Sequence, residues 1–324
     1  MNSNFINKLI CPETNSDLLL QNNILLSKKG NNRYVIEDQI LRLKKNTEEI
    51  KTEQVRKFYM DYPFPNYNSF DDIDDFIKKK TNNAYIQSLL NIIKPNDDVL
   101  EFGCGTGQLC NYLSAVSYAN IVGADLSFNS LRIAKNFKVK NNLMAINFIE
   151  TDIFKPCFKK NTFDVIICSG VLHHTIDPYL AFLNLTKYLK EEGHIIIGLY
   201  NKISRLKNSL IKFLSYIIGD SSFNIFDPIY RKKNSLAKKS WLKDQYFHPI
   251  EKRYYFKDLH RWFESNNIDF INSIPSYEKK LQFNEKAKQG DQFDQLNLQI
   301  IDLFENKEGG LFIFLGKKIK KLHI

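Results

Sequence analysis

The chain has 324 residues, of which 43% are apolar and 25% charged, and its formal net charge is +10. These values are typical of a soluble globular protein with one large or two modest domains and a substantial core. No apolar run reaches the roughly 18 residues that cross a bilayer, the first residues lack a secretory-signal pattern, and the five cysteines form no C-x-x-C pair. This argues against a membrane-spanning or disulfide-rich secreted protein, and we expect a cytoplasmic protein with buried free thiols.

Residues 1–45 are predicted to form a small β module. The stretch "YVIEDQILRL" (34–43) has strand-like alternation around a polar turn. Together with "LICPETNSDLLL" it resembles a small zinc-ribbon-like module. Only Cys11 of the Cys-Pro-x-Cys pair of such modules is present, Thr14 stands at the partner position, and no second pair exists. Tetrahedral zinc requires four ligands, so we expect a degenerate module without a metal.

Residues 46–96 are predicted to form a helical connector. A helix is expected over 46–60 and another over 71–93. Between them the chain should be irregular, because Pro63 and Pro65 each bias the preceding residue away from helix.

The connector is rich in aromatic residues just before the next domain, in "FYMDYPFPNY" (58–67). Two interpretations stand side by side. Tyr59, Tyr62 and Tyr67 either line a ligand pocket or form an apolar contact between the two domains. We take Tyr62 as a candidate substrate residue.

Strand and helix patterns alternate over residues 97–200. Helices are expected at 107–117, 127–138 and 177–191, and the apolar strands are "DVLEFG" (98–103), "NIVGAD" (120–125), "INFIET" (146–151), "FDVIICS" (163–169) and "HIIIGLY" (194–200). Buried β-branched runs separated by helices predict an α/β fold with a parallel sheet covered on both faces. In such a sheet the ligand lies beyond the carboxyl ends of the strands, next to the first one.

A glycine loop follows the first strand at that position. Gly103, Gly105 and Gly107 give the pattern G-x-G-x-G instead of the G-x-G-x-x-G of dinucleotide-binding proteins. Glu101 stands two residues before the first glycine. Its carboxylate would repel a pyrophosphate and attract an amino group or a sulfonium. The loop therefore favours a cofactor for group transfer.

The next strands also end in candidate ligand-binding residues. Asp125 lies 22 positions after Gly103, where an acid can accept hydrogen bonds from both ribose hydroxyls. Asp152 ends the third strand, where it can accept from an adenine amino group. The fourth strand ends in "CSGVLHH", which contains Ser169 and a histidine pair. A lone aspartate at a strand end is more often a helix cap. The prediction of a binding site therefore depends on the spacing of all these residues taken together.

The series "EFGCGTG", "GADLS", "TDIF" and "FDVIICSGVLHH" resembles the class I S-adenosylmethionine-dependent methyltransferases over about residues 97–200, and more loosely up to 318. The resemblance implies a Rossmann-like sheet of seven strands whose last strand, here "GLFIFLG", is antiparallel. It implies S-adenosylmethionine as cofactor and the following contacts: Glu101 and the loop Gly103, Cys104, Gly105 and Gly107 for the methionine part, Asp125 for the ribose, Asp152 and Ile153 for the adenine edge, Leu126 for the adenine face, and Ser169. Cys104 also fits a plain packing role.

Methyl transfer from a sulfonium needs a general base only when the acceptor must lose a proton. His173 and His174 are the candidate catalytic residues, because histidine titrates near neutrality; the alternative is that they only hold the loop in place. Enzymes of this class that methylate nucleic-acid bases often carry Asn or Asp followed by Pro-Pro-aromatic where this chain has "SGVLHH". The chain resembles the branch that methylates small molecules on oxygen, carbon or nitrogen.

A basic insertion is expected at residues 201–255, after the fifth strand. Residues 201–261 hold 14 Lys and Arg against 5 Asp and Glu, nearly the whole excess of positive charge. The predicted helix in "SRLKNSLIKFLSYIIGD", with its amphipathic face at 205–218, has three interpretations: a lid whose apolar face packs on the domain, a peripheral contact with an anionic membrane, or part of a positive field for RNA. Tyr246 and His248 are further candidate acceptor residues.

Residues 256–324 are expected to complete the sheet with a helix at 256–266 and strands at 268–274 and 310–318. The sequence thus predicts a methyltransferase for a small-molecule acceptor. The alternatives are a tRNA- or rRNA-modifying enzyme, an enzyme for a lipid or quinone at a membrane surface, and a non-catalytic binding module. The acceptor, the methylated atom and the oligomeric state stay open.

Overall fold

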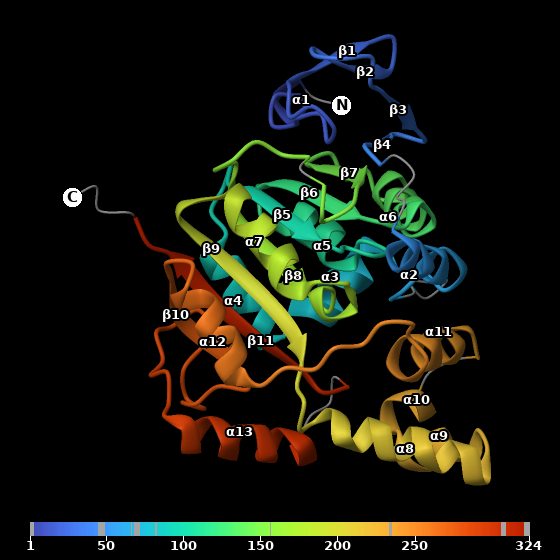
Figure 1. The fold of residues 1–324 in the computed structure, drawn as a ribbon, viewed down its shortest axis with the longest axis vertical. Helices are drawn as coiled ribbons and strands as arrows, with labels where there is room; N and C mark the ends of the chain where they lie inside the picture. Colours follow the sequence, from blue (N-terminus) through green and yellow to red (C-terminus); the bar gives the residue numbers. More distant parts are fainter. Residues whose placement is uncertain are drawn as a thin grey trace.

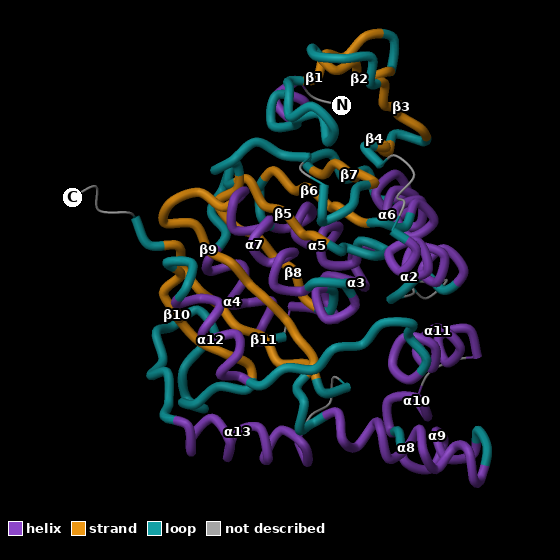
Figure 2. Tube along the Cα trace, in the orientation of Figure 1, coloured by secondary structure: helices purple, strands orange, loops and turns teal. Residues whose placement is uncertain are grey.

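One large sheet organises the molecule (Figures 1 and 2). The computed structural model describes residues 3–44, 49–65, 67, 72–81, 83–155, 157–232, 235–305 and 309–320. Its strands are β1 (Leu18–Gln21), β2 (Ile24–Ser27), β3 (Arg33–Glu37), β4 (Ile40–Arg42), β5 (Asp98–Phe102), β6 (Asn120–Asp125), β7 (Ile146–Glu150), β8 (Phe163–Ser169), β9 (Leu189–Tyr200), β10 (Ile268–Ile274) and β11 (Leu311–Lys318). They lie in the order β1-β2-β3-β4-β7-β6-β5-β8-β9-β11-β10.

The five central strands, from β7 to β9, are parallel, and β11 runs antiparallel between β9 and β10. Successive residues of a strand point to opposite faces, and the two faces carry two separate cores. Leu100 of β5 faces the core covered by α7 (Pro178–Tyr188) and α12 (Phe256–Glu264). Val99 faces the other core, which is covered by α3 (Ile73–Thr81), α4 (Ala84–Ile92), α5 (Gln108–Val116) and α6 (Phe128–Lys140).

The expected count of seven strands is wrong, because the N-terminal module adds four strands to the sheet. β4 pairs with β7 in parallel, with Leu41 opposite Ile149. The side chain of Arg42 donates to Glu150 at 2.5 Å across the same junction. An open β7 edge would expose unpaired backbone groups, and β4 covers that edge.

The N-terminal module holds its single cysteine in a cluster of hydroxyl groups. The thiol of Cys11 is buried and lies 3.2 Å from the hydroxyl of Tyr34. Thr14, Ser16 and Ser27 bond to one another at 2.8–2.9 Å. Within the described residues no group of three or more His, Cys, Asp or Glu side chains is placed to hold a metal ion.

The connector consists of α2 (Ile50–Asp61), α3 and α4. The single helix expected over 71–93 is divided in two, because the side chain of Asn83 caps α4 by accepting from the Ile86 amide at 3.1 Å. α2 packs against α6, at the side of the sheet where the glycine loop lies.

The segment between β9 and α12 forms a helical layer beneath the sheet (Figure 1). It contains α8 (Arg205–Ile218), α9 (Ser221–Phe226), α10 (Pro228–Lys232) and α11 (Ser235–Tyr246), and α13 (Gln292–Glu305) continues the layer. Ile211, Phe223 and Tyr246 form its small core. None of the helices in the described ranges has the length and apolar character needed to cross a membrane.

Candidate functional site

The glycine loop between β5 and α5 approaches its neighbours too closely for side chains. Gly103 and Gly105 have φ values of +76° and +53°. A Cβ at Gly103 would collide with the side chain of Val171, and one at Gly105 with the backbone carbonyl of Phe64. These two positions therefore need glycine, and they leave bare backbone facing the space above the sheet.

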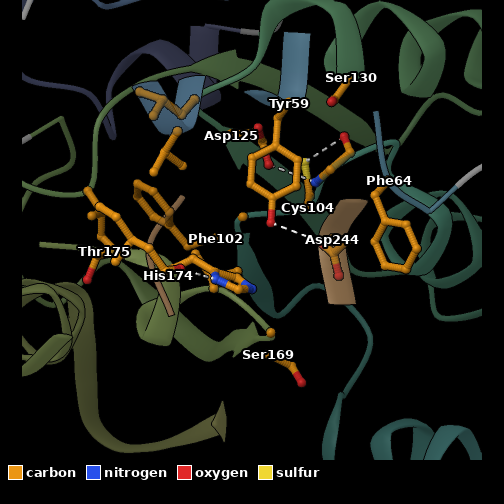
Figure 3. A pocket seen from close by; sticks show the side chains of 18 of the residues that line it. Tyr59, Phe64, Phe102, Cys104, Asp125, Ser130, Ser169, His174, Thr175 and Asp244 are labelled. Atoms are coloured by element: carbon orange, nitrogen blue, oxygen red, sulfur yellow. Dashed lines mark hydrogen bonds between the residues drawn. The ribbon is translucent and has the colours of Figure 1, made fainter. Parts of the chain in front are cut away.

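A cavity of about 470 Å³ opens at the carboxyl ends of β5, β6, β7 and β8 (Figure 3). Its volume lies in the range of pockets that hold small ligands. Eleven of the residues singled out in the sequence line it: Tyr59, Glu101, Gly103, Cys104, Gly105, Asp125, Leu126, Asp152, Ile153, Ser169 and His174.

Five of the candidates are absent from the lining: Gly107, His173, Tyr62, Tyr246 and His248. Gly107 is the residue before α5 and packs against the side chain of Ala134, so its role is structural. The Tyr246 hydroxyl donates to Asp227 at 3.0 Å inside the core of the insertion. Tyr62 is half-buried, its ring is tilted against that of Phe58, and Lys239 and Lys243 of α11 lie over it.

Glu101 places a carboxyl group in the cavity with few partners. Its Oε2 accepts from the Cys110 amide at 3.0 Å and from the Cys110 thiol at 2.8 Å. Burial raises its pKa to about 7. A cationic group that enters the cavity beside Glu101 would favour the ionised form and be held by it.

Asp125 is fixed by the backbone of the loops around it. Its Oδ1 accepts from the Ser127 amide at 2.7 Å and its Oδ2 from the Gly105 amide at 2.8 Å. Burial raises its pKa to about 6. Each oxygen keeps acceptor capacity for a further donor, which suits a pair of neighbouring hydroxyls.

Asp152 lies at the end of the cavity formed by β7. Its Oδ1 accepts from the Phe154 amide at 3.0 Å, and burial raises its pKa. Ile153 and Phe154 lie beside it in the lining and supply apolar surface for a flat ring.

Beyond Tyr59, as seen from Asp125, the cavity is lined by Asp244, Gln245 and Phe64, which were not expected from the sequence. Asp244 of α11 is buried and accepts from the Tyr59 hydroxyl at 3.0 Å and from Gln245 Nε2 at 2.9 Å. Burial raises its pKa to about 6. Figure 3 shows Tyr59 between Asp125 and Asp244, with its hydroxyl directed at Asp244. Phe64 and Trp241 line the same end.

A buried arginine, Arg205, holds the side chains around Asp244 in place through hydrogen bonds and an ion pair. Arg205 donates to Gln245 Oε1 at 2.8 Å and forms an ion pair with Glu251 at 2.5 Å. Its guanidinium lies 4.1 Å from the ring centre of Tyr200, which lines the cavity. Gln245 in turn donates to the Tyr200 hydroxyl at 2.7 Å. The network fixes the side chains around Asp244.

The two histidines after β8 differ in their environment. His173 is buried, its ring stacks 3.8 Å from that of Tyr200, and its Nδ1 accepts from the Tyr200 amide at 3.2 Å. Burial holds its pKa well below the usual value. His173 is therefore a neutral residue that holds the loop against β9.

His174 lines the cavity, and its Nδ1 lies 2.7 Å from the carbonyl oxygen of Ile250. Since a carbonyl only accepts, Nδ1 carries the proton and Nε2 is left as an acceptor. Burial lowers the pKa of His174 to about 3, so it is a weak base. The ring of His248 lies 3.7 Å from it and supports it from outside the cavity.

Comparison with known proteins identifies the domain around this cavity. Residues 100–197 match a family described as "Methyltransferase domain". The ubiquinone biosynthesis O-methyltransferase of Rickettsia akari is 28% identical over 122 residues, which cover 38% of this chain and 47% of that protein. The phosphoethanolamine N-methyltransferase of Triticum aestivum is 32% identical over 108 residues, 33% of this chain and 21% of that one. The solved structure of PKMT2 from Rickettsia typhi in complex with AdoHcy has a TM-score of 0.51 at 16% identity and covers 79% of this chain and 55% of its own.

The matched segments span about half or less of these relatives, 47% and 21% of their lengths. The structural likeness concerns the fold, and the sequence match concerns the strands and loops that form the cavity. Residues 100–197 therefore form a methyltransferase domain, and S-adenosylmethionine is the cofactor of this family.

Proposed function

We propose that the protein methylates a hydroxyl group of a small, largely apolar acceptor that binds at the α11 end of the cavity. The observation that carries this proposal is a single cavity that is lined both by Glu101 and Asp125 and by Asp244 and Gln245, with Tyr59 between Asp125 and Asp244 (Figure 3). The first pair suits the cationic and ribose parts of the cofactor. The second pair suits a polar group of a different molecule.

The residues at the cofactor end fit S-adenosylmethionine in charge and in shape. The carboxyl of Glu101 can hold the amino group, and the carboxylate of Asp125 can accept from both ribose hydroxyls. Gly103 and Gly105 have no side chains, so the cofactor can approach the backbone of the loop closely. When bound, S-adenosylmethionine supplies a methyl group that its sulfonium charge activates for displacement.

The acceptor end combines apolar walls with one carboxylate. Phe64, Ile229, Trp241 and Leu311 provide apolar surface, and Asp244 is a buried carboxylate among them. Such a site suits a hydrophobic molecule that carries one hydrogen-bond donor. An ammonium group would stay protonated beside Asp244, and its lone pair would be blocked. A hydroxyl keeps a lone pair free for attack while it donates to Asp244.

Asp244 then serves as the proton acceptor. With a pKa of about 6, Asp244 is ionised at neutral pH, and this pKa is close enough to the working pH for the carboxylate to accept a proton. Tyr59 and Gln245 each donate to one of its oxygens and fix its orientation. His174, with a pKa of about 3, contributes a neutral acceptor at Nε2, and the aromatic side chains exclude water. The relatives include an O-methyltransferase and an N-methyltransferase, and the chemistry of Asp244 favours oxygen.

The test measures formation of S-adenosylhomocysteine with three kinds of acceptor: catechols with alkyl tails of increasing length, phosphoethanolamine, and bulk RNA. We expect turnover with the catechols only. Asp244→Asn should lower kcat by about 100-fold or more and change the dissociation constant of S-adenosylmethionine by less than about threefold. Asp220→Asn, an exposed position of the same insertion, is the matched control. Transfer to RNA or phosphoethanolamine alone, or an unchanged kcat for Asp244→Asn, would contradict the proposal.

A further inference from the structure

Two helices of the lower layer turn their apolar sides outward. In α8 the residues Leu206, Leu210, Phe213 and Ile217 are 56%, 59%, 60% and 66% exposed. They follow one another at intervals of four, three and four residues, so they form one stripe along the helix. The lid interpretation of the sequence, in which this face packs on the domain, is wrong, because the stripe faces solvent.

The side of α8 that faces the protein is mostly polar. Arg205 is buried there within its network of hydrogen bonds, and Asn208, Lys212 and Ser215 are half-buried. Among the large apolar residues of this helix, Ile211 is the buried one. The contacts of this helix with the domain are therefore largely polar, and most of its large apolar side chains face solvent.

α13 repeats this arrangement with a different sequence. Phe293, Leu296, Ile300 and Phe304 form an outward stripe and are 77%, 44%, 42% and 79% exposed. On the inner side, Gln299 accepts from the Phe256 amide at 3.3 Å. A helix that turns its polar side inward and its apolar side outward is opposite to the usual surface helix of a globular protein.

The two stripes belong to one edge of the molecule. α8 and α13 follow one another along the lower border in Figure 1. They are joined where α13 ends, since Ser204 donates to Asp302 and Arg205 donates to the Gly309 carbonyl at 2.9 Å. Each helix has 14 residues and is about 21 Å long. We call the eight residues of the two stripes the apolar edge: Leu206, Leu210, Phe213, Ile217, Phe293, Leu296, Ile300 and Phe304.

An exposed patch of this size marks a contact surface, and the charge around it distinguishes between possible occupants. Residues 201–261, which include α8, hold 14 Lys and Arg against 5 Asp and Glu, and Lys207 of α8 is exposed. α13 carries no Lys or Arg, and the exposed acids Asp294 and, just before the helix, Asp291 lie at its end away from α8. Two copies that met through their α8 stripes would bring together two helices that carry bases and no acids, which is unfavourable. Anionic lipid headgroups attract them.

We propose that the apolar edge docks the protein on an anionic lipid surface, with the outward sides of α8 and α13 in the headgroup region. The same insertion lends Ile229 of α10 and Trp241 and Asp244 of α11 to the cavity. Docking therefore brings the acceptor end of the cavity to the lipid, from which an apolar acceptor can enter. The docking itself does not depend on the proposed reaction.

The experiment measures flotation of the full chain with vesicles of phosphatidylcholine, alone and mixed with phosphatidylglycerol, without cofactor or acceptor. We expect binding to the mixed vesicles, much weaker binding to the neutral ones, and a loss of binding as salt is added. The double variants Leu210→Asp/Phe213→Asp and Ile300→Asp/Phe304→Asp should each weaken binding by about 100-fold. Because these side chains are exposed, folding should be kept, and calorimetry with S-adenosylmethionine checks it.

Met144→Asp is the matched control, because Met144 is 88% exposed and lies outside the apolar edge. It should bind the mixed vesicles like the unchanged chain. The proposal is overturned if the unchanged chain does not float with the mixed vesicles, or if Met144→Asp loses as much binding as the edge variants. It is also overturned if sedimentation finds a dimer that Leu210→Asp/Phe213→Asp dissociates while vesicle binding is absent, since a second copy would then occupy the edge.

Discussion

Binding of S-adenosylmethionine should depend steeply on pH through Glu101. The pKa of its buried carboxyl is about 7 in the unliganded protein. The cationic amino group binds the ionised form, so below pH 7 the carboxyl must first lose a proton. The affinity then falls tenfold for each pH unit, about 100-fold at about pH 5, as long as the bound cation keeps Glu101 ionised.

Asp125 adds a second step to the same profile. Its pKa is about 6, and in the proposed binding mode the ribose hydroxyls donate to its ionised form. At about pH 5 this contributes about another tenfold, so the dissociation constant should rise about 1,000-fold between pH 8 and pH 5. The slope of log Kd against pH should be −1 between the two pKa values and approach −2 below both.

The change Glu101→Gln separates the two contributions. Glutamine retains an acceptor for the Cys110 amide, which Oε2 of Glu101 binds at 3.0 Å. At pH 8 the variant should bind S-adenosylmethionine about 10- to 100-fold more weakly, since a hydrogen bond to a charged group contributes about 1.5–3 kcal/mol. Its remaining pH dependence should show the Asp125 step alone.

Isothermal titration calorimetry between pH 5 and pH 8 measures both curves, and Glu192→Gln, at an exposed position of β9, serves as the control. A flat profile for the unchanged chain would remove Glu101 and Asp125 from the cofactor site. So would a Glu101→Gln variant that keeps both the affinity and the slope of the unchanged chain.

Three further outcomes follow from the same structure. Without cofactor, Glu101→Gln should raise the free energy of unfolding at pH 8 by up to about 3 kcal/mol in urea titrations. The raised pKa of Glu101 means that its ionised form destabilises the folded state; this cost grows from about pH 4.5 to pH 7 and stays constant above. At pH 4 the gain should vanish. Gly105→Ala should abolish cofactor binding in calorimetry, because its Cβ would collide with the Phe64 carbonyl and φ is +53°. Arg205→Met should lower the free energy of unfolding by about 1–3 kcal/mol, since it leaves the buried Gln245 Oε1 and the Gly309 carbonyl without their donor; a thermal melt like that of the unchanged chain would contradict this.

The cofactor end of the cavity was accessible from sequence because its geometry is local. Glu101 and Gly103 sit on one strand and its loop, and Asp125 and Asp152 end the next strands of a parallel sheet. Carboxyl ends of parallel strands meet at one edge, so the strand pattern alone places these side chains together. The lining of the cavity contains all four.

At the acceptor end the sequence indicated Tyr59 but not Asp244, because the place of Asp244 depends on contacts between distant segments. Tyr59 and Asp244 are 185 residues apart in the chain and bond at 3.0 Å. No local pattern predicts such a contact. One signal was present: Asp244 is the single acid within the basic stretch 238–250. The histidine pair drew attention by its chemistry, yet burial makes both side chains weak bases.

The α8 segment shows a second limit of sequence patterns. An amphipathic period tells which residues share a side of a helix, but not which side faces the protein. Here Arg205 decides it, because a buried guanidinium that bonds Gln245, Glu251 and Gly309 turns that side inward. The apolar stripe must then face outward. The same residue that positions the acceptor end of the cavity thereby exposes the surface proposed to meet the lipid. A substitution on the outer stripe should therefore change vesicle binding and leave the cavity intact, whereas a substitution of Arg205 should disturb both.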